Sequence, residues 1–184
     1  MNAPFPHQPG TATLIDLVDP GEQRRLEQFV ANHPEGTPFH RPAWLLATAC
    51  GTGNRALALV IERQGEIAAM LPLLDVHSPL FGRVLVSSGF GVGGGVLASD
   101  AKAGKALLDV AEELALRRSC PSIELRGGLL PKARAGWKIR HDSHCGFVAP
   151  LAADDEAQLT WIPRKQRAEV RKGLANDLDI AIGS

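Results

Sequence analysis

Two apolar runs joined by a short polar turn constrain the fold of this chain most. The runs cover residues 56–62 and 67–76, and residues 63–66, with the sequence Arg-Gln-Gly-Glu, separate them. This pattern predicts a β-hairpin, because a glycine-containing turn lets two buried strands pair directly. Pro72 in the second run cannot donate to a neighbouring strand, so we expect an edge position or a bulge there. A third strand is expected at 84–88.

Helical periodicity surrounds this hairpin. Asp19 and Pro20 predict the start of a helix that ends near Asn32, and the strongest amphipathic pattern starts at Ser99 or Asp100 and ends near residue 118. Other helices are expected after residue 42, at 154–160 and at 163–177, and other strands at 13–18, 122–126, 137–140, 145–150 and 178–182. This order predicts an α+β layered domain with a mostly antiparallel sheet flanked by helices.

The composition is that of a globular domain. Among 184 residues, 45% are hydrophobic, and 20 Lys+Arg balance 20 Asp+Glu. These values exclude wholesale disorder, a coiled coil and a disulfide-stapled miniprotein, and they confine any polyanion binding to a local patch. Residues 1–10 are predicted to form a disordered lead-in without signal-peptide character. The three widely spaced cysteines predict reduced thiols and a cytoplasmic location.

A glycine-rich stretch follows the third predicted strand. Gly89, Gly91 and Gly94 fit the G-x-G-x-x-G pattern of dinucleotide-binding proteins. That pattern requires a helix that opens immediately, whereas residues 95–98 intervene here. A P-loop is excluded because no Gly-Lys-Ser/Thr follows. We therefore favour a glycine loop of close backbone approach, either structural or lining a substrate cleft.

Histidines and a cysteine form a second candidate site. His141, His144 and Cys145 could ligate zinc, but a fourth ligand is missing nearby, and on a strand the two histidines would point to opposite faces. Surface histidines are favoured, and no metal is expected. His40 and His77 are interpreted as loop histidines by default.

A basic helix is predicted near the end of the chain. Residues 163–172 carry five cations and one carboxylate. Arg164, Arg167 and Arg171 recur at i, i+3 and i+7, so they share one face and could grip phosphates. The expected buried stripe of the same helix consists of Val170, Leu174 and Leu178. Anion binding and a plain solvated helix face stay equally open.

Five segments together resemble the FemAB family, in particular the FemAB-like proteins associated with exosortase and PEP-CTERM exopolysaccharide systems. The segments, in the family's order, are 37–44, 78–83, 90–96, 123–127 and 163–173. The resemblance implies two GNAT-like acyltransferase domains in tandem. The implied divisions are the first domain at 11–160, a basic connecting helix at 161–178 and the start of a truncated second domain at 179–184.

The resemblance also implies a function. It predicts an acyl or aminoacyl transferase in which this domain contributes to acceptor binding, with acyl-CoA or aminoacyl-tRNA as co-substrate and a phosphate-bearing envelope or polysaccharide precursor as acceptor. No tightly bound cofactor is expected, and no catalytic residue is assigned. The residues that would contact substrate are Arg164, Lys165, Arg167 and Arg171 of the basic segment and Phe90, Gly91, Gly93 and Gly94 of the glycine loop. The donor site is expected in the missing second domain, because the chain has no Gln/Arg-x-x-Gly-x-Gly loop.

Two other interpretations stay open. The chain could be a non-catalytic binding or scaffold domain that recognises nucleic acid or an acidic partner through its basic helix, or a complete acetyltransferase that binds acetyl-CoA. An exposed strand at 178–182 would also favour homo-oligomers through edge pairing.

Overall fold

The computed structural model describes residues 11–80, 82–128, 134–140, 146–176 and 178–179. It divides into two compact units, residues 1–139 and residues 140–184. The elements of the first unit are β1 (Thr11–Ile15), α1 (Pro20–Asn32), the 3-10 turn η1 (Pro38–His40), α2 (Pro42–Thr52), β2 (Arg55–Arg63), β3 (Glu66–Ser78), β4 (Gly82–Ser87), β5 (Leu97–Ala98), α3 (Ala101–Arg117) and β6 (Ile123–Glu124). The second unit contains α4 (Asp155–Trp161) and α5 (Arg164–Leu174).

The first unit is built on one sheet with the strand order β1-β2-β3-β4-β6, and β5 also pairs with β3. Every described pair of strands is antiparallel except β4 and β6, which run parallel. The predicted hairpin is the β2–β3 pair at the centre of this sheet. The prediction of an α+β domain with a mostly antiparallel sheet flanked by helices is therefore confirmed.

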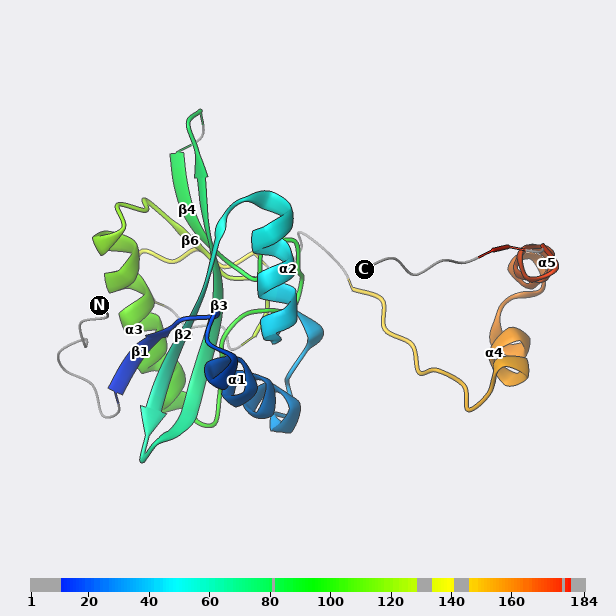
Figure 1. Ribbon diagram of the computed structural model, residues 1–184, viewed down its shortest axis with the longest axis horizontal. Coiled ribbons are helices and arrows are strands. Elements are labelled where there is room, and N and C mark those ends of the chain that lie inside the picture. The colour runs from blue at the N-terminus through cyan, green and yellow to red at the C-terminus, as the bar shows by residue number, and fades with distance from the viewer. Residues whose placement is uncertain (1–10, 81, 129–133, 141–145, 177, 180–184) are drawn as a thin grey trace. The chain divides into compact units, whose positions relative to one another are not determined.

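Helices cover both faces of the sheet (Figure 1). Leu59 and Ile61 of β2 pack in one buried cluster with Leu107 of α3. Val60, between them in the sequence, packs in a second cluster with Leu26 of α1. Successive side chains of a strand point to opposite faces, so a continuous apolar run serves both layers. The result is a helix–sheet–helix sandwich, with α3 on one face and α1 and α2 on the other.

The strand position next to β3, on the side away from β2, is interrupted by an insertion. Along β3, Leu73 lies opposite Ser87 of β4, and Met70 lies opposite Leu97 of β5. Three steps on β3 therefore correspond to ten steps on the neighbouring segment, so this segment contains seven more residues than the stretch of β3 beside it. This insertion is the predicted glycine-rich stretch. As a result, β4 and β5 pair with the same side of β3, as two parts of one interrupted strand.

The insertion explains the position of Pro72. We predicted an edge strand or a bulge at this proline, but β3 is a central strand, with β2 on one side and β4 and β5 on the other. The edge prediction is therefore wrong. The backbone oxygen of Pro72 accepts a hydrogen bond from Ser88 N at 3.3 Å, so this side of Pro72 faces the insertion. Proline has no N–H to donate, and on this side no described strand residue lies opposite Pro72 as an acceptor. The irregularity that tolerates the proline therefore lies in the neighbouring strand.

Helix starts agree closely with the sequence. The Asp19 carboxylate caps α1 by accepting from Gly21 N at 2.6 Å, and the Asp100 carboxylate caps α3 by accepting from Ala103 N at 2.7 Å. Helix α2 ends at Gly53, whose φ of 68° is left-handed. These ends were predictable because capping depends on a few neighbouring residues.

Two predictions of strands differ from the structure. Residues 137–140 and 146–150 are not in strands, so that predicted strand pair is wrong within the described residues. Trp137 packs instead against the α3 side of the core, where its Nε1 donates to Glu112 of α3. Of the strand predicted at 178–182, only residues 178 and 179 are described, and they are not in a strand. The edge-pairing prediction for this segment otherwise lies outside the described residues.

The helices of the second unit are short, and their apolar side chains are open to solvent. Leu174 is 70% exposed and Leu178 is 68% exposed, so the described residues of this unit do not themselves bury the predicted stripe of the basic helix. In the described part of this unit only α4 and α5 are regular. Within the described residues, no helix is both long and apolar enough to cross a bilayer.

Candidate functional site

The glycine loop, residues 88–95, contains the insertion between β4 and β5. Segment 37–44, which contains η1 and the start of α2, holds its backbone through side-chain hydrogen bonds. These bonds are Thr37 Oγ1 to Gly93 O (3.0 Å), His40 Nε2 to Gly95 O (3.0 Å), Trp44 Nε1 to Gly89 O (3.2 Å) and Ser88 Oγ to Phe39 O (2.8 Å). The structure therefore brings together two of the segments on which the family resemblance depends.

His40 lies in the middle of this contact and is 1% exposed. Its Nδ1 accepts from the backbone N–H of Thr37 at 3.2 Å, so its Nε2 carries the proton and donates to the oxygen of Gly95. Both ring nitrogens are satisfied in the neutral form. Burial lowers the pKa of His40, and its hydrogen bond to Gly95 offsets only part of this effect. His40 is a structural clamp of the glycine loop rather than the exposed loop histidine predicted from the sequence.

A buried neutral histidine makes stability depend on pH. The unfolded chain takes up this proton at about pH 6.5, whereas the folded chain takes it up only at lower pH, so the contribution is complete above about pH 6.5 and declines on acidification. We expect His40→Gln to flatten this decline in urea unfolding curves between about pH 7.5 and 5. His77→Gln, which removes an exposed imidazole, is the control, and the larger flattening is expected in His40→Gln. An unchanged slope in His40→Gln would assign the decline to other groups.

The glycine-loop residues predicted to contact substrate differ in the space around them. A Cβ at Gly94 would lie 2.0 Å from Ser88 Cβ, and a Cβ at Gly91 would lie 2.8 Å from an aromatic ring carbon. At Gly93 the nearest atom would be 3.6 Å away, which is an ordinary contact. Phe90 is exposed and has a φ of 62°. Packing thus requires Gly91 and Gly94, while Gly93 and Phe90 are open to a ligand.

The predicted phosphate-gripping cations of α5 also differ. Arg164, Lys165 and Arg171 are exposed, and they have no side-chain partner within the described part of the chain. Arg167 turns back to the end of α4, where its Nε and Nη2 donate to Ile162 O at 3.1 and 2.9 Å. Three of the four cations are therefore available to an anion, and Arg167 fastens the connection between α4 and α5.

The candidate zinc ligands His141, His144 and Cys145 lie outside the described residues. Among the residues that are described, no group of three or more His, Cys, Asp or Glu side chains could hold a metal ion.

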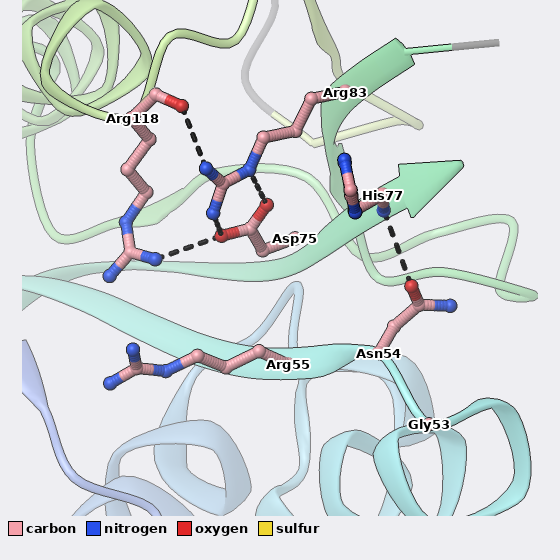
Figure 2. Close-up of a pocket in the computed structure, with 7 residues that line it drawn as sticks. All are labelled: Gly53, Asn54, Arg55, Asp75, His77, Arg83 and Arg118. Atoms are coloured by element: carbon pink, nitrogen blue, oxygen red, sulfur yellow. Dashed lines mark hydrogen bonds and ion pairs between the residues drawn. The ribbon is translucent and has the colours of Figure 1, made fainter. Parts of the chain in front are cut away.

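A second polar site, not indicated by the sequence, lies at one end of strands β2, β3 and β4 (Figure 2). This pocket has a volume of about 390 Å³ and is lined by Gly53, Asn54, Arg55, Asp75, His77, Arg83 and Arg118. We call it the arginine pocket. None of the lining residues that the structure describes has an apolar side chain, so the pocket suits a charged or strongly polar ligand.

Asp75 is the centre of the arginine pocket, and its side chain is 2% exposed. Arg83 donates to it through two nitrogens, with Nε 2.7 Å from Oδ1 and Nη2 2.6 Å from Oδ2. Arg118 Nη1 donates to Oδ2 at 2.8 Å. Burial by itself would raise the pKa of Asp75, but the hydrogen bonds from both arginines outweigh burial and hold that pKa below its usual value. Asp75 is therefore ionised at neutral pH.

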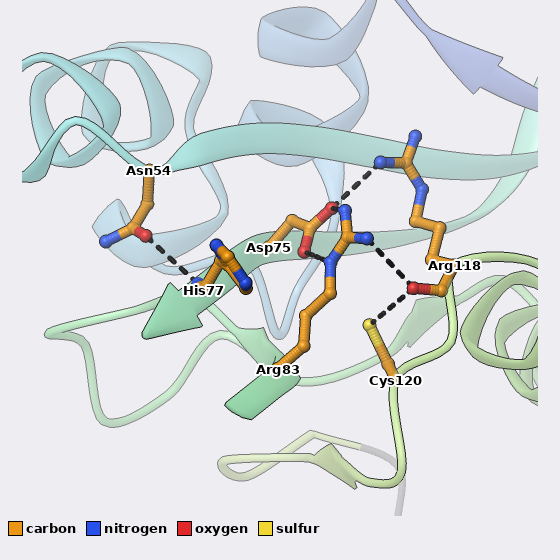
Figure 3. A network of polar contacts seen from close by, with 6 residues as sticks. All are labelled: Asn54, Asp75, His77, Arg83, Arg118 and Cys120. Carbon is orange, nitrogen blue, oxygen red and sulfur yellow. Dashed lines mark hydrogen bonds and ion pairs between the residues drawn. The ribbon is translucent and has the colours of Figure 1, made fainter. Parts of the chain in front are cut away.

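Backbone pairing and a helix end bring these charges together. His77 pairs with Arg83 across β3 and β4, which places Arg83 diagonally opposite Asp75. Arg118 follows the last residue of α3, and its carbonyl oxygen accepts from Arg83 Nη1 at 2.9 Å and from Cys120 Sγ at 3.8 Å (Figure 3). Burial raises the pKa of the Cys120 thiol, so this cysteine stays protonated at neutral pH. The network ties β3, β4 and the α3–β6 connection into one unit.

One signal in the sequence could have indicated this site. Asp75 lies within the apolar run at 67–76, at a position that a hairpin buries. A buried carboxylate requires a cationic partner, so arginines near the ends of the neighbouring elements were the candidates. The sequence does not specify which arginines pair with Asp75, because the strand register decides which side chains meet.

No protein-family model matches the chain, and no curated protein matches it, so the FemAB resemblance remains a prediction. Solved structures are similar to it at low identity. A ribosomal-protein-alanine N-acetyltransferase from Brucella melitensis biovar Abortus 2308 is 18% identical, with a TM-score of 0.46 over 72% of this chain and 99% of that chain.

Two further similar structures are acetyltransferases. A GNAT family acetyltransferase from Staphylococcus aureus is 18% identical, with a TM-score of 0.43 over 76% of this chain and 97% of that chain. An aminoglycoside N-acetyltransferase in complex with CoA is 10% identical, with a TM-score of 0.38 over 73% of this chain and 99% of that chain. At these TM-scores, the likenesses assign neither a family nor an activity to the chain.

Proposed function

We propose that the chain supplies the acceptor-binding domain of a FemAB-type acyl or aminoacyl transferase that acts in cell-envelope or exopolysaccharide biosynthesis. The reaction would be attack of an acceptor amine on a thioester or ester of the donor, with acyl-CoA or aminoacyl-tRNA as the donor. Such chemistry depends on positioning and on stabilisation of the developing oxyanion. The mixed, mostly antiparallel sheet flanked by helices is the arrangement expected of a GNAT-like domain, and it supports this proposal.

We assign this domain to acceptor binding rather than donor binding because of the groups at the N-terminus of α3. In a GNAT-like domain that binds the donor, a glycine-bearing loop after the central strand is expected to hold the pyrophosphate. Here the Asp100 carboxylate occupies this helix end by accepting from Ala103 N, and it also pairs with Arg63. A helix N-terminus attracts anions, but one already capped by a carboxylate repels a pyrophosphate.

The glycine loop supports the same assignment. The backbone N–H of Gly91 in this loop already donates to Ser88 O at 2.8 Å, and Gly94 is packed against Ser88. A pyrophosphate cradle needs open backbone N–H groups rather than a closely packed loop. We therefore place the donor outside this domain.

Backbone NMR of the 184-residue chain tests this proposal. Titration with a nucleotide-linked amino sugar, as a model of the acceptor, should give saturable shifts in the first unit. Titration with acetyl-CoA should leave the amides of Ala101–Gly104 unmoved, because the α3 N-terminus is closed to a pyrophosphate. Saturable shifts of these amides, together with release of free CoA thiol by this chain, would place the donor site here and overturn the proposal.

The exposed cations of α5 favour one alternative function. Arg164, Lys165 and Arg171 are free to contact the phosphates of a nucleic acid or the carboxylates of an acidic partner, as expected of a non-catalytic binding domain. Binding of single-stranded RNA that falls steeply with salt, and becomes less salt-dependent in Arg164→Ala, would support this alternative. Salt-insensitive or absent RNA binding would contradict it.

A further inference from the structure

We propose that the arginine pocket binds a phosphoryl group, as a phosphate or diphosphate, between Arg55 and Arg118. The sequence predicts phosphate contacts on α5 and substrate contacts on the glycine loop, whereas this pocket contains neither. That the phosphoryl group belongs to the acceptor rests on the proposed function. The anion site itself rests on the pocket alone.

The charges of the pocket are unbalanced. Three arginines line it, and Asp75 is the one carboxylate among the lining residues that the structure describes. The three guanidinium groups and the one carboxylate leave two positive charges uncompensated inside a concave surface. A phosphate monoester carries about −1.5 to −2 charges at neutral pH, which matches this excess, whereas a single carboxylate ligand would leave part of it.

The arginines divide into a scaffold and a binding pair. Arg83 uses Nε and Nη2 on Asp75 and Nη1 on the carbonyl oxygen of Arg118, so all three of its side-chain nitrogens are engaged. Arg118 uses only Nη1, and its Nε is buried without a hydrogen-bond partner. Arg55 is exposed and has no partner among the described residues. Unused guanidinium donors therefore gather on Arg55 and Arg118.

The position of these donors fits one ligand. Arg55 lies directly opposite Asp75 in the β2–β3 register, and Arg118 contacts the same aspartate from the end of α3. Figure 2 shows the side chains of Arg55 and Arg118 extending to the left of the view, with both guanidinium groups on the same side of Asp75. Guanidinium groups bind phosphate oxygens through paired N–H donors, which gives both strength and orientation.

Two neutral groups complete the lining. Asn54 Oδ1 accepts from the backbone N–H of His77 at 3.4 Å, which leaves its amide nitrogen free to donate. The imidazole of His77 is exposed and can donate to the same ligand. The pocket thus offers donors from the β2 start, the β3 end and the α3 end, whereas its carboxylate oxygens are already occupied by arginines.

Calorimetry and arginine side-chain NMR of the full chain test this site, with inorganic phosphate and uridine diphosphate as separate probes. We expect saturable one-to-one binding with a Kd of about 1 mM or below, and at least a tenfold weaker Kd in Arg55→Gln. The melting temperature of this variant should not change, because Arg55 is exposed and unpaired. Tighter binding of uridine diphosphate than of phosphate would indicate a nucleotide-linked ligand, and equal binding would indicate the phosphoryl group alone.

Two matched variants separate this site from general charge. Arg24→Gln removes the same charge from an exposed position on α1, and Arg140→Gln removes it from an exposed position outside the helices. Both should keep wild-type affinity for phosphate. No saturable binding, or binding that either control weakens as much as Arg55→Gln does, would overturn the site. Acetyl-CoA shifts at the first turn of α3 would overturn the proposed function instead and leave the pocket as an anion site.

Discussion

Replacing Asp75 by asparagine is expected to lower the free energy of unfolding by about 3 kcal/mol, because it breaks a buried ion-pair network while leaving both guanidinium groups in place. The Asp75 side chain is 2% exposed and accepts three hydrogen bonds from Arg83 and Arg118. An amide offers one acceptor and turns its NH₂ group toward cations. Urea unfolding followed by circular dichroism at pH 7 measures the loss.

The control for this substitution is an exposed ion pair. Glu27 and Arg41 lie 3.0 Å apart with side chains 42% and 50% exposed, so Glu27→Gln should lower the free energy of unfolding by less than about 1 kcal/mol.

The pH dependence of stability gives a second check. Because the pKa of Asp75 is lowered in the folded chain, its contribution is complete above about pH 4 and is lost as the pH falls through the folded value. The wild type and Asp75→Asn should converge there, and equal effects of the two substitutions at pH 7 would contradict the prediction.

Gly94→Ala is expected to destabilise the first unit by about 3 kcal/mol through overpacking. The added methyl would lie 2.0 Å from Ser88 Cβ, and Ser88 cannot easily move, since it is fully buried and its hydroxyl is bonded to Phe39 O. Thermal unfolding and urea midpoints measure this effect.

Gly93→Ala is the matched control at the next position. Its methyl would meet no atom closer than 3.6 Å, so the stability should change by less than about 1 kcal/mol. The pair also tests the glycine loop as a ligand surface. Gly93→Ala with unchanged stability but weaker ligand binding would support close backbone approach there, whereas similar melting temperatures for both variants would contradict the packing account of Gly94.

Local features of the sequence predicted much of the fold. The caps at Asp19 and Asp100 and the glycine turn between β2 and β3 each depend on a few adjacent residues, so they were correctly placed. Pro72 was assigned to the wrong strand position because the feature that tolerates it lies in a neighbouring segment. Residues 137–140 alternate like a strand, but alternation does not show that a partner edge exists.

The candidate site depends on contacts between distant residues. Asp75 and Arg118 are 43 residues apart in the sequence, and they meet only because β3 ends beside the end of α3. The contact between His40 and Gly95 spans 55 residues. No local pattern contains this information. The sequence indicated the glycine loop and segment 37–44 separately, and the fold shows that they are one structure.

The seven-residue insertion and Pro72 depend on each other. Deleting the insertion would join β4 and β5 into one continuous strand, and this strand would then face a residue that has no N–H to donate. Restoring the amide while keeping the insertion would leave a donor without a strand partner. The insertion therefore accommodates the proline, and a continuous strand in its place would leave one of its own acceptors without a donor.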